Sequence, residues 1–152
     1  RNHDSQVERV RFTGPADARL FDDIDDPRAA EATVRPGPMA RVVDVERALE
    51  TIEFPPDADG SLTLDVTDES CAWNNGTFRP CVADGRGTVD RAPGTATAAA
   101  SLDIGSLSRL VIGSHAVDSL IELGGVTVED AEVRDALATA FPPTDPFLRE
   151  GF

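Results

Sequence analysis

The residues with the most evident chemical potential lie in one short stretch, residues 68–78, which holds the chain's single tryptophan and one of its two cysteines. A thiol acts as a nucleophile where a neighbouring base, cation or metal favours the thiolate. Neither Cys71 nor Cys81 has a histidine or acidic partner in sequence that marks such a pair. The two thiols can approach each other across the stretch, but two cysteines do not make a disulfide scaffold. We therefore expect two reduced, partly buried thiols.

Other patterns that could bind a metal or a phosphate are incomplete. The two histidines, His3 and His115, are far apart in sequence, and the chain has no C-x-x-C, so we expect no metal site. The acidic run 22–26 does not match the ligand spacing of a calcium loop and is typical of a solvated surface. Gly85 and Gly87 do not form a phosphate-binding glycine pattern before a helix.

Extended segments must position the 68–78 stretch. Apolar and polar residues alternate over 62–67, and a second extended segment follows at 77–82, which predicts strand, loop and strand. Asn75-Gly76 can supply the positive φ that the return needs. Trp73 is predicted to anchor the core or the sheet edge, because its indole covers a large apolar area and its N–H needs one partner.

The segment before this region is predicted to contain short elements. Alternation predicts a strand over 9–12, and Pro15 can open a short helix that carries Leu20, Phe21 and Ile24. Another helical turn is expected over 27–30. Two extended runs, 32–34 and 39–43, bracket a Pro-Gly turn and predict a hairpin.

The rest of the chain predicts strands first and helices later. Asp44 is a suitable N-cap for the first helix, Ser114 for a later one, and Thr127–Asp130 is typical of a capping box before the last. The expected elements are a helix over 45–51, strands over 62–66, 77–82, 88–92 and 96–103, and helices over 104–112, 116–123 and 127–141. This order indicates an α+β fold, one sheet with helices packed on it.

Composition narrows the class of protein. The 152 residues carry a formal charge of −14, and the 14 residues counted as lysine or arginine are all arginine. We expect no nucleic-acid partner, since a basic face is missing from the sequence, and no membrane span, since no long apolar run exists. An aspartate-rich, lysine-free chain suits very high salt, as in the cytoplasm of a halophilic archaeon. The chain lacks an initial methionine and is expected to be a fragment of a longer protein, with residues 1–6 ending a preceding element.

Several segments in the expected order resemble one known family. The hairpin and helix over 33–49, the loop Cys71-Ala72-Trp73-Asn74-Asn75-Gly76, the helix with Leu107 and Leu110-Val111-Ile112-Gly113, and the closing 141–152 resemble the sterol-carrier-protein-2-like (SCP2-like) domain of Eis-like GNAT N-acetyltransferases. The resemblance covers nearly the whole chain. It implies a mixed, mostly antiparallel sheet with helices mainly on one face. It also implies a lead-in at 7–38, a core at 39–143 and a docking tail at 144–152.

The resemblance implies a function for the tail. In that family the domain walls the acceptor-amine pocket, and the chain-terminal carboxylate, here that of Phe152, is the general base. Glu150 and Phe147 would then line the substrate pocket. Acetyl-CoA is expected in the N-terminal GNAT domain rather than in this chain, which lacks the CoA loop and any tyrosine for the family's general acid. The expected partners are that GNAT domain, an amine substrate and further copies of the protein, with this chain inactive alone.

Two other functions stay open. A lipid or sterol carrier needs an apolar tunnel, which Leu107, Leu110, Leu120, Ile121 and Leu137 could line, although residues at this spacing are more often packed core. The domain could instead serve as an oligomerisation module without a catalytic role.

Overall fold

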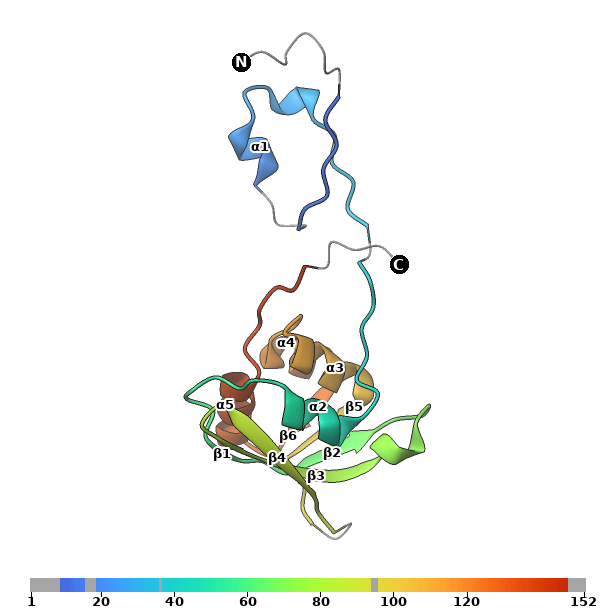
Figure 1. Cartoon of the computed structure of the whole chain (residues 1–152), viewed down its shortest axis with the longest axis vertical. Helices are drawn as coiled ribbons and strands as arrows, with labels where there is room; N and C mark the ends of the chain where they lie inside the picture. The colour runs from blue at the N-terminus through green and yellow to red at the C-terminus, as the bar shows by residue number, and fades with distance from the viewer. Residues whose placement is uncertain (1–8, 16–18, 36, 94–95, 148–152) are drawn as a thin grey trace. The chain divides into compact units, whose positions relative to one another are not determined.

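The computed structural model describes residues 9–15, 19–35, 37–93 and 96–147. The chain forms two compact units, Arg1–Met39 with Phe147–Phe152, and Ala40–Pro146 (Figure 1). No described helix is long and apolar enough to cross a membrane.

The described part of the first unit contains two short helical segments. The α-helix α1 spans Leu20–Asp23, and the 3-10 helix η1 spans Pro27–Ala29, with the Asp26 carboxylate accepting from the Arg28 N–H. The predicted strand over 9–12 is wrong, because its Val10 and Phe12 are exposed and pair with no described strand. The predicted hairpin over 32–43 is also wrong. Its second arm bonds elsewhere, since the Val42 N–H donates to the Ser108 hydroxyl.

The second unit is built on one six-stranded sheet. Its strands are β1 (Gly60–Ser61), β2 (Leu64–Thr67), β3 (Gly76–Ala83), β4 (Arg86–Arg91), β5 (Ala100–Asp103) and β6 (Val126–Val128). The order is β1-β3-β2-β5-β6, and β4 also pairs with β3. Only the β2–β5 pairing is parallel among these strands.

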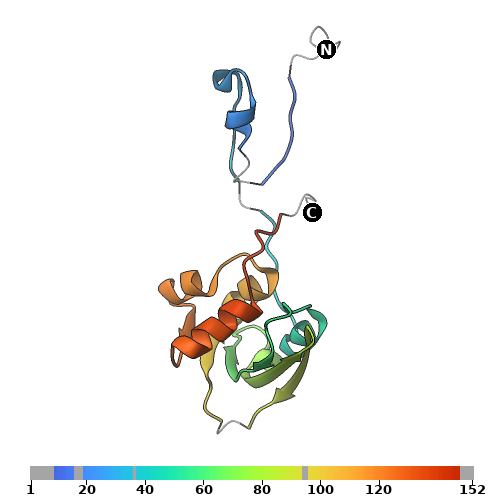
Figure 2. The same cartoon turned by 90° about the vertical axis from the view of Figure 1, so that its left-hand side faces the viewer.

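One face of this sheet is buried and four helices pack against it. Along β3 the side chains of Phe78, Pro80 and Val82 are buried and alternate with exposed ones. The helices are α2 (Val45–Thr51), α3 (Ile104–Ile112), α4 (Val117–Glu122) and α5 (Ala131–Ala140) (Figures 1 and 2). They contribute Leu49, Leu107, Leu120 and Leu137 to the core. The α+β, mostly antiparallel, SCP2-like fold is therefore confirmed.

Local sequence explains where three of the α-helices begin. Asp44, Asp103 and Asp130 each precede a helix and accept a hydrogen bond from an N–H of its first turn. The capping box at Thr127 is wrong, because Thr127 lies in β6 and pairs with Ser101. Ser114 is not the cap of α4 either, since Ala116 occupies that position without a side-chain bond.

Two strand predictions need correction. Of the strand expected over 62–66, only 64–66 forms a strand, as part of β2, and β1 ends just before this segment at Ser61. Leu62 donates to the Pro80 carbonyl, but Pro80 has no N–H to return, so the ladder is interrupted there. The strand expected over 96–103 covers only Ala100–Asp103.

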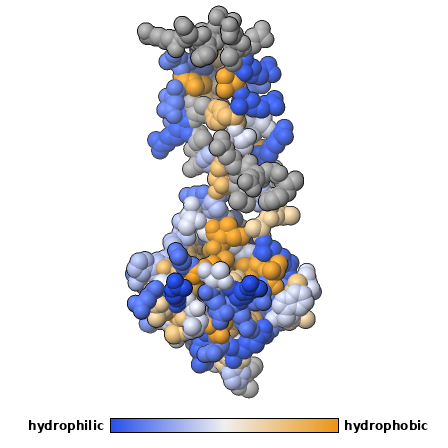
Figure 3. Space-filling view, in the orientation of Figure 1, coloured by the Kyte–Doolittle hydropathy of each residue, from blue (hydrophilic) through white to orange (hydrophobic). Residues whose placement is uncertain are grey.

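On the surface, hydrophilic residues cover much of the face drawn in Figure 3.

Candidate functional site

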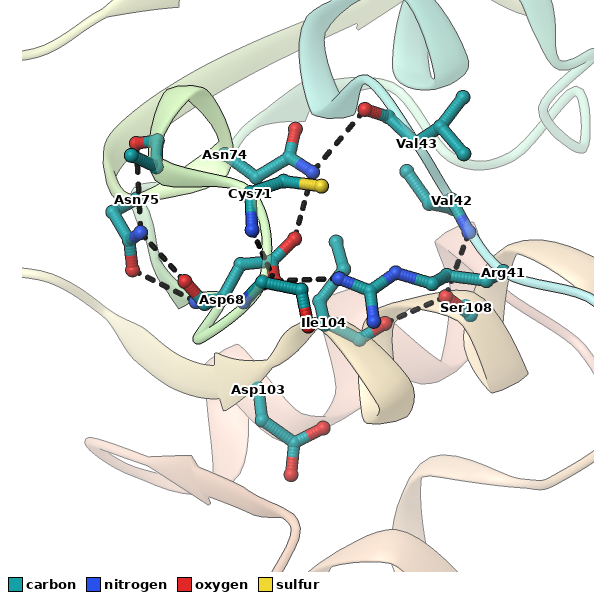
Figure 4. A network of polar contacts seen from close by, with 12 residues as sticks. Arg41, Val42, Val43, Asp68, Cys71, Asn74, Asn75, Asp103, Ile104 and Ser108 are labelled. Carbon is teal, nitrogen blue, oxygen red and sulfur yellow. Dashed lines mark hydrogen bonds and ion pairs between the residues drawn. The ribbon is translucent and has the colours of Figure 1, made fainter.

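The loop between β2 and β3 is organised around the carboxylate of Asp68. Its Oδ1 accepts from the Arg41 guanidinium at 2.5 Å and from the Ser70 and Cys71 N–H groups at 2.8 and 3.0 Å. Its Oδ2 accepts from Asn74 Nδ2 at 2.9 Å (Figure 4). The side chain of Asp68 is fully shielded from solvent. The sequence pattern did not single out Arg41 or Asp68 as site residues.

These bonds decide the protonation state of Asp68. The hydrogen bond from Asn74 and those from Arg41 and the two backbone groups outweigh the opposing effect of burial, so the pKa of Asp68 lies well below its usual range. A carboxylate this acidic is a poor proton acceptor at neutral pH. Asp68 therefore acts as a fixed anion that holds the loop.

Two asparagines complete the network. Asn74 is buried, accepts from the Val45 N–H at 3.1 Å and donates to the Val43 carbonyl at 3.3 Å. Asn75 accepts from the Asp68 N–H at 2.7 Å and donates to the Asp68 carbonyl at 2.8 Å. Both side chains thus do more than form a turn. Asn74 connects the loop to the start of α2, and Asn75 pairs with the main chain of Asp68.

Trp73 does not anchor the core, which was one of its two predicted roles. The residue is 60% exposed, but its Nε1–H has the one partner that was predicted, since it donates to the Val43 carbonyl at 2.8 Å. The 3-10 helix η2 (Ala72–Asn74) turns Asn74 inward, which leaves the preceding residue outside. Both thiols are free, but only Cys71 is partly buried as expected, because Cys81 is exposed.

The predicted site at the end of the chain is described only in part. Phe147 is exposed and belongs to the first unit. Glu150 and Phe152 lie outside the described residues. The start of the tail is attached to the end of α3, because Thr144 donates through its N–H to the Gly113 carbonyl at 2.8 Å and through its Oγ1 to the Ile112 carbonyl at 3.2 Å.

A cavity of about 340 Å³ lies beside this attachment. Residues at the C-terminal ends of α2, α3 and α5 line it, and Glu53 is the only ionisable residue among them. A smaller cavity of about 170 Å³ shares Phe54 and Phe141 with it, and these two rings pack edge to face at 5.7 Å.

The leucines proposed to line a lipid tunnel are packed instead. Leu107, Leu120 and Leu137 are fully buried in the core. Of the five residues considered, only Leu110 lines either of these two cavities.

Comparison with known proteins shows one matching family and several similar solved structures. A family described as a sterol carrier protein domain matches residues 45–149. The crystal structure of Eis1 from Mycobacterium abscessus is 27% identical, with 91% of this chain and 34% of that chain covered and a TM-score of 0.70. No curated protein matches the chain.

Two further solved structures are GCN5-related N-acetyltransferases. The protein from Anabaena variabilis is 26% identical over 70% of this chain and 26% of its own, with a TM-score of 0.64. The protein from Kribbella flavida is 25% identical over 74% of this chain and 28% of its own, with a TM-score of 0.66. The chain thus spans between a quarter and about a third of the length of these structures.

Proposed function

This chain belongs to the family of sterol carrier protein domains, and from that premise we propose that it is the accessory domain of an acetyl-CoA-dependent N-acetyltransferase. The observation that carries the proposal is the similarity to N-acetyltransferase structures of which this chain covers between a quarter and about a third, two of them named GCN5-related. Acetyl-CoA would bind in a separate GNAT domain. This chain would wall the pocket for the acceptor amine.

We further propose that the terminal carboxylate of Phe152 is the general base. An acceptor ammonium must lose a proton before its nitrogen can attack the acetyl thioester. A free α-carboxyl has a pKa of about 3.3–3.7, which is too low for an efficient base at neutral pH. Desolvation against aromatic rings such as Phe147 would raise it, and Glu150 would add negative charge that attracts the cationic acceptor.

The decisive experiment extends the full-length protein by one alanine after Phe152. The extension moves the carboxylate by one residue, or at most about 3.6 Å, without altering the described fold. We expect kcat with an amine acceptor to fall by about 100-fold, within the range of general-base catalysis. Phe152→Leu is the matched control, because it keeps a terminal carboxylate at the same position. Unchanged turnover in the extended protein would refute the base role.

The family's name favours lipid transport as a second candidate function. Native mass spectrometry of the purified protein would detect a co-purifying lipid. The buried leucines described above favour a packed core, so we expect the mass of the bare chain.

A further inference from the structure

The C-terminal tail leaves the second unit through a defined attachment. After Pro142-Pro143, the main chain and the side chain of Thr144 both bond to carbonyls at the end of α3, those of Gly113 and Ile112. These carbonyls would otherwise lack partners, because the last carbonyls of a helix have no N–H ahead of them. Thr144 therefore serves as a C-cap of α3 that is supplied by the tail.

The attachment requires glycine at position 113. Gly113 has φ of 74°, and a Cβ placed there would lie 2.3 Å from Thr144 Oγ1 and 3.0 Å from Thr144 N. A side chain at 113 would thus be strained and would also displace the tail. We refer to Gly113 and Thr144 together as the tail latch.

The same helix holds the segment that opens the second unit. The Val42 N–H donates to the buried Ser108 hydroxyl at 2.9 Å, and this hydroxyl donates to the Ile104 carbonyl at 2.6 Å. Ser108 and Ile112 are one helical turn apart, or about 6 Å along the axis. The two segments that flank the unit are therefore fixed at a defined spacing on α3.

We propose that the tail latch is a positioning device, in which Thr144 and Gly113 set the point and the direction at which the tail leaves α3, upstream of the proposed base at Phe152. The inference depends on the proposed function. Phe152 follows Thr144 by eight residues, so its reach from the latch is at most about 28 Å. Without the latch the tail would start at Phe141, the C-cap residue of α5, and be three residues longer.

This difference gives a quantitative test. If the tail were only a flexible tether, lengthening it from eight to eleven residues would lower the effective concentration of the carboxylate by less than about twofold. If the latch sets direction, its loss misplaces the base and kcat falls by about tenfold or more. A tenfold loss with an unchanged KM for acetyl-CoA would thus separate orientation from tethering.

The experiment uses the full-length protein with Thr144→Val, which removes the hydroxyl and keeps the size. Thr144→Ser should restore activity, because it returns the hydroxyl. Thr139→Val is the matched control, since Thr139 Oγ1 makes a comparable bond to the Asp135 carbonyl within α5. Gly113→Ala is a second variant that displaces the tail from the other side.

Hydrogen exchange reports the latch without relying on activity. In the segment 142–147 only Thr144, Asp145 and Phe147 carry an N–H, so the protection of Thr144 is readily followed. We expect faster exchange in Thr144→Val and in Gly113→Ala than in Thr139→Val. Unchanged exchange in both latch variants would overturn the inference.

Two activity outcomes separate this inference from the proposed function. If exchange rises and the one-residue extension abolishes activity, but Thr144→Val changes kcat by less than twofold, the positioning role is refuted and the general base stands. If the extension itself leaves turnover unchanged, the general base is refuted and the positioning role with it.

Discussion

At the scale of single residues, the buried carboxylate of Asp68 couples the stability of the fold to pH. Its pKa is depressed by Asn74, Arg41 and the loop N–H groups, so the folded protein favours the charged form. A depressed pKa contributes stability that is present above the ordinary aspartate pKa of about 3.9. That stability is lost as the pH falls below this value towards the lower folded pKa.

The Asp68→Asn variant tests this coupling. At pH 6 we expect the variant to be less stable than the wild type. An amide at position 68 would either place its NH2 group against that of Asn74, or turn its oxygen to Asn74 and therefore away from Arg41. Below about pH 4 the wild type loses its advantage while the variant has no such titration, so the difference should narrow. Urea unfolding of both proteins between pH 6 and pH 2.5 measures this difference in the free energy of unfolding. A constant difference across this range would contradict the expectation.

Single residues also mark where sequence reasoning fell short. The Asn-Asn-Gly pattern correctly indicated a return between two strands. It could not reveal that Asn74 is buried, because its partners Val43 and Val45 lie about 30 residues upstream. Thr144 gave only a weak signal, a lone hydroxyl between two proline motifs, and its partners lie on a distant helix.

At the scale of elements, the contact between α2 and β4 depends on the absence of a side chain at Gly87. A Cβ there would lie 2.6 Å from the Leu49 carbonyl oxygen and 2.9 Å from Phe54 Cε2. Neither neighbour is free to move, because one is backbone and the other a buried ring. The glycine considered for a phosphate loop is therefore explained by close packing.

We expect Gly87→Ala to lower the free energy of unfolding by about 1–3 kcal/mol, as overpacking usually does. Gly37→Ala is the control, since nothing lies within 4 Å of a Cβ there and the change should stay within about 0.5 kcal/mol. Chemical denaturation of both variants makes the comparison. Equal stabilities would mean that α2 can shift at little cost.

Elements with local signals were predicted well, and those fixed by distant contacts were not. The bounds of α2 and α3 agree with the structure because apolar periodicity is strong over both helices. The strand β6 was missed because Thr127 to Asp130 also matches a capping pattern, and only pairing with β5 decides between the two. The expected hairpin over 32–43 failed because its polar groups bond to α3 and the loop instead.

At the scale of the whole molecule, a formal charge of −14 must be accommodated by the folded chain. Repulsion between like charges destabilises a compact state in dilute buffer. Salt screens this repulsion, and the Debye length falls from about 10 Å at 0.1 M to about 3 Å at 1 M. We therefore propose that the chain is adapted to high salt.

The test of this proposal is thermal unfolding across a KCl series from 0.1 to 3 M. Screening of exposed charges is nearly complete by about 1 M, so a rise in Tm confined to that range would report repulsion alone. A chain adapted to high salt should gain further stability from 1 to 3 M, because salt ions excluded from the surface strengthen apolar burial. We expect a total rise of about 10 °C or more, which corresponds to about 2.5–5 kcal/mol, since each kcal/mol shifts Tm by about 2–4 °C in a chain of this length. A Tm that stays constant from dilute buffer to 3 M KCl would refute the adaptation, because neither repulsion nor exclusion would then limit the folded state.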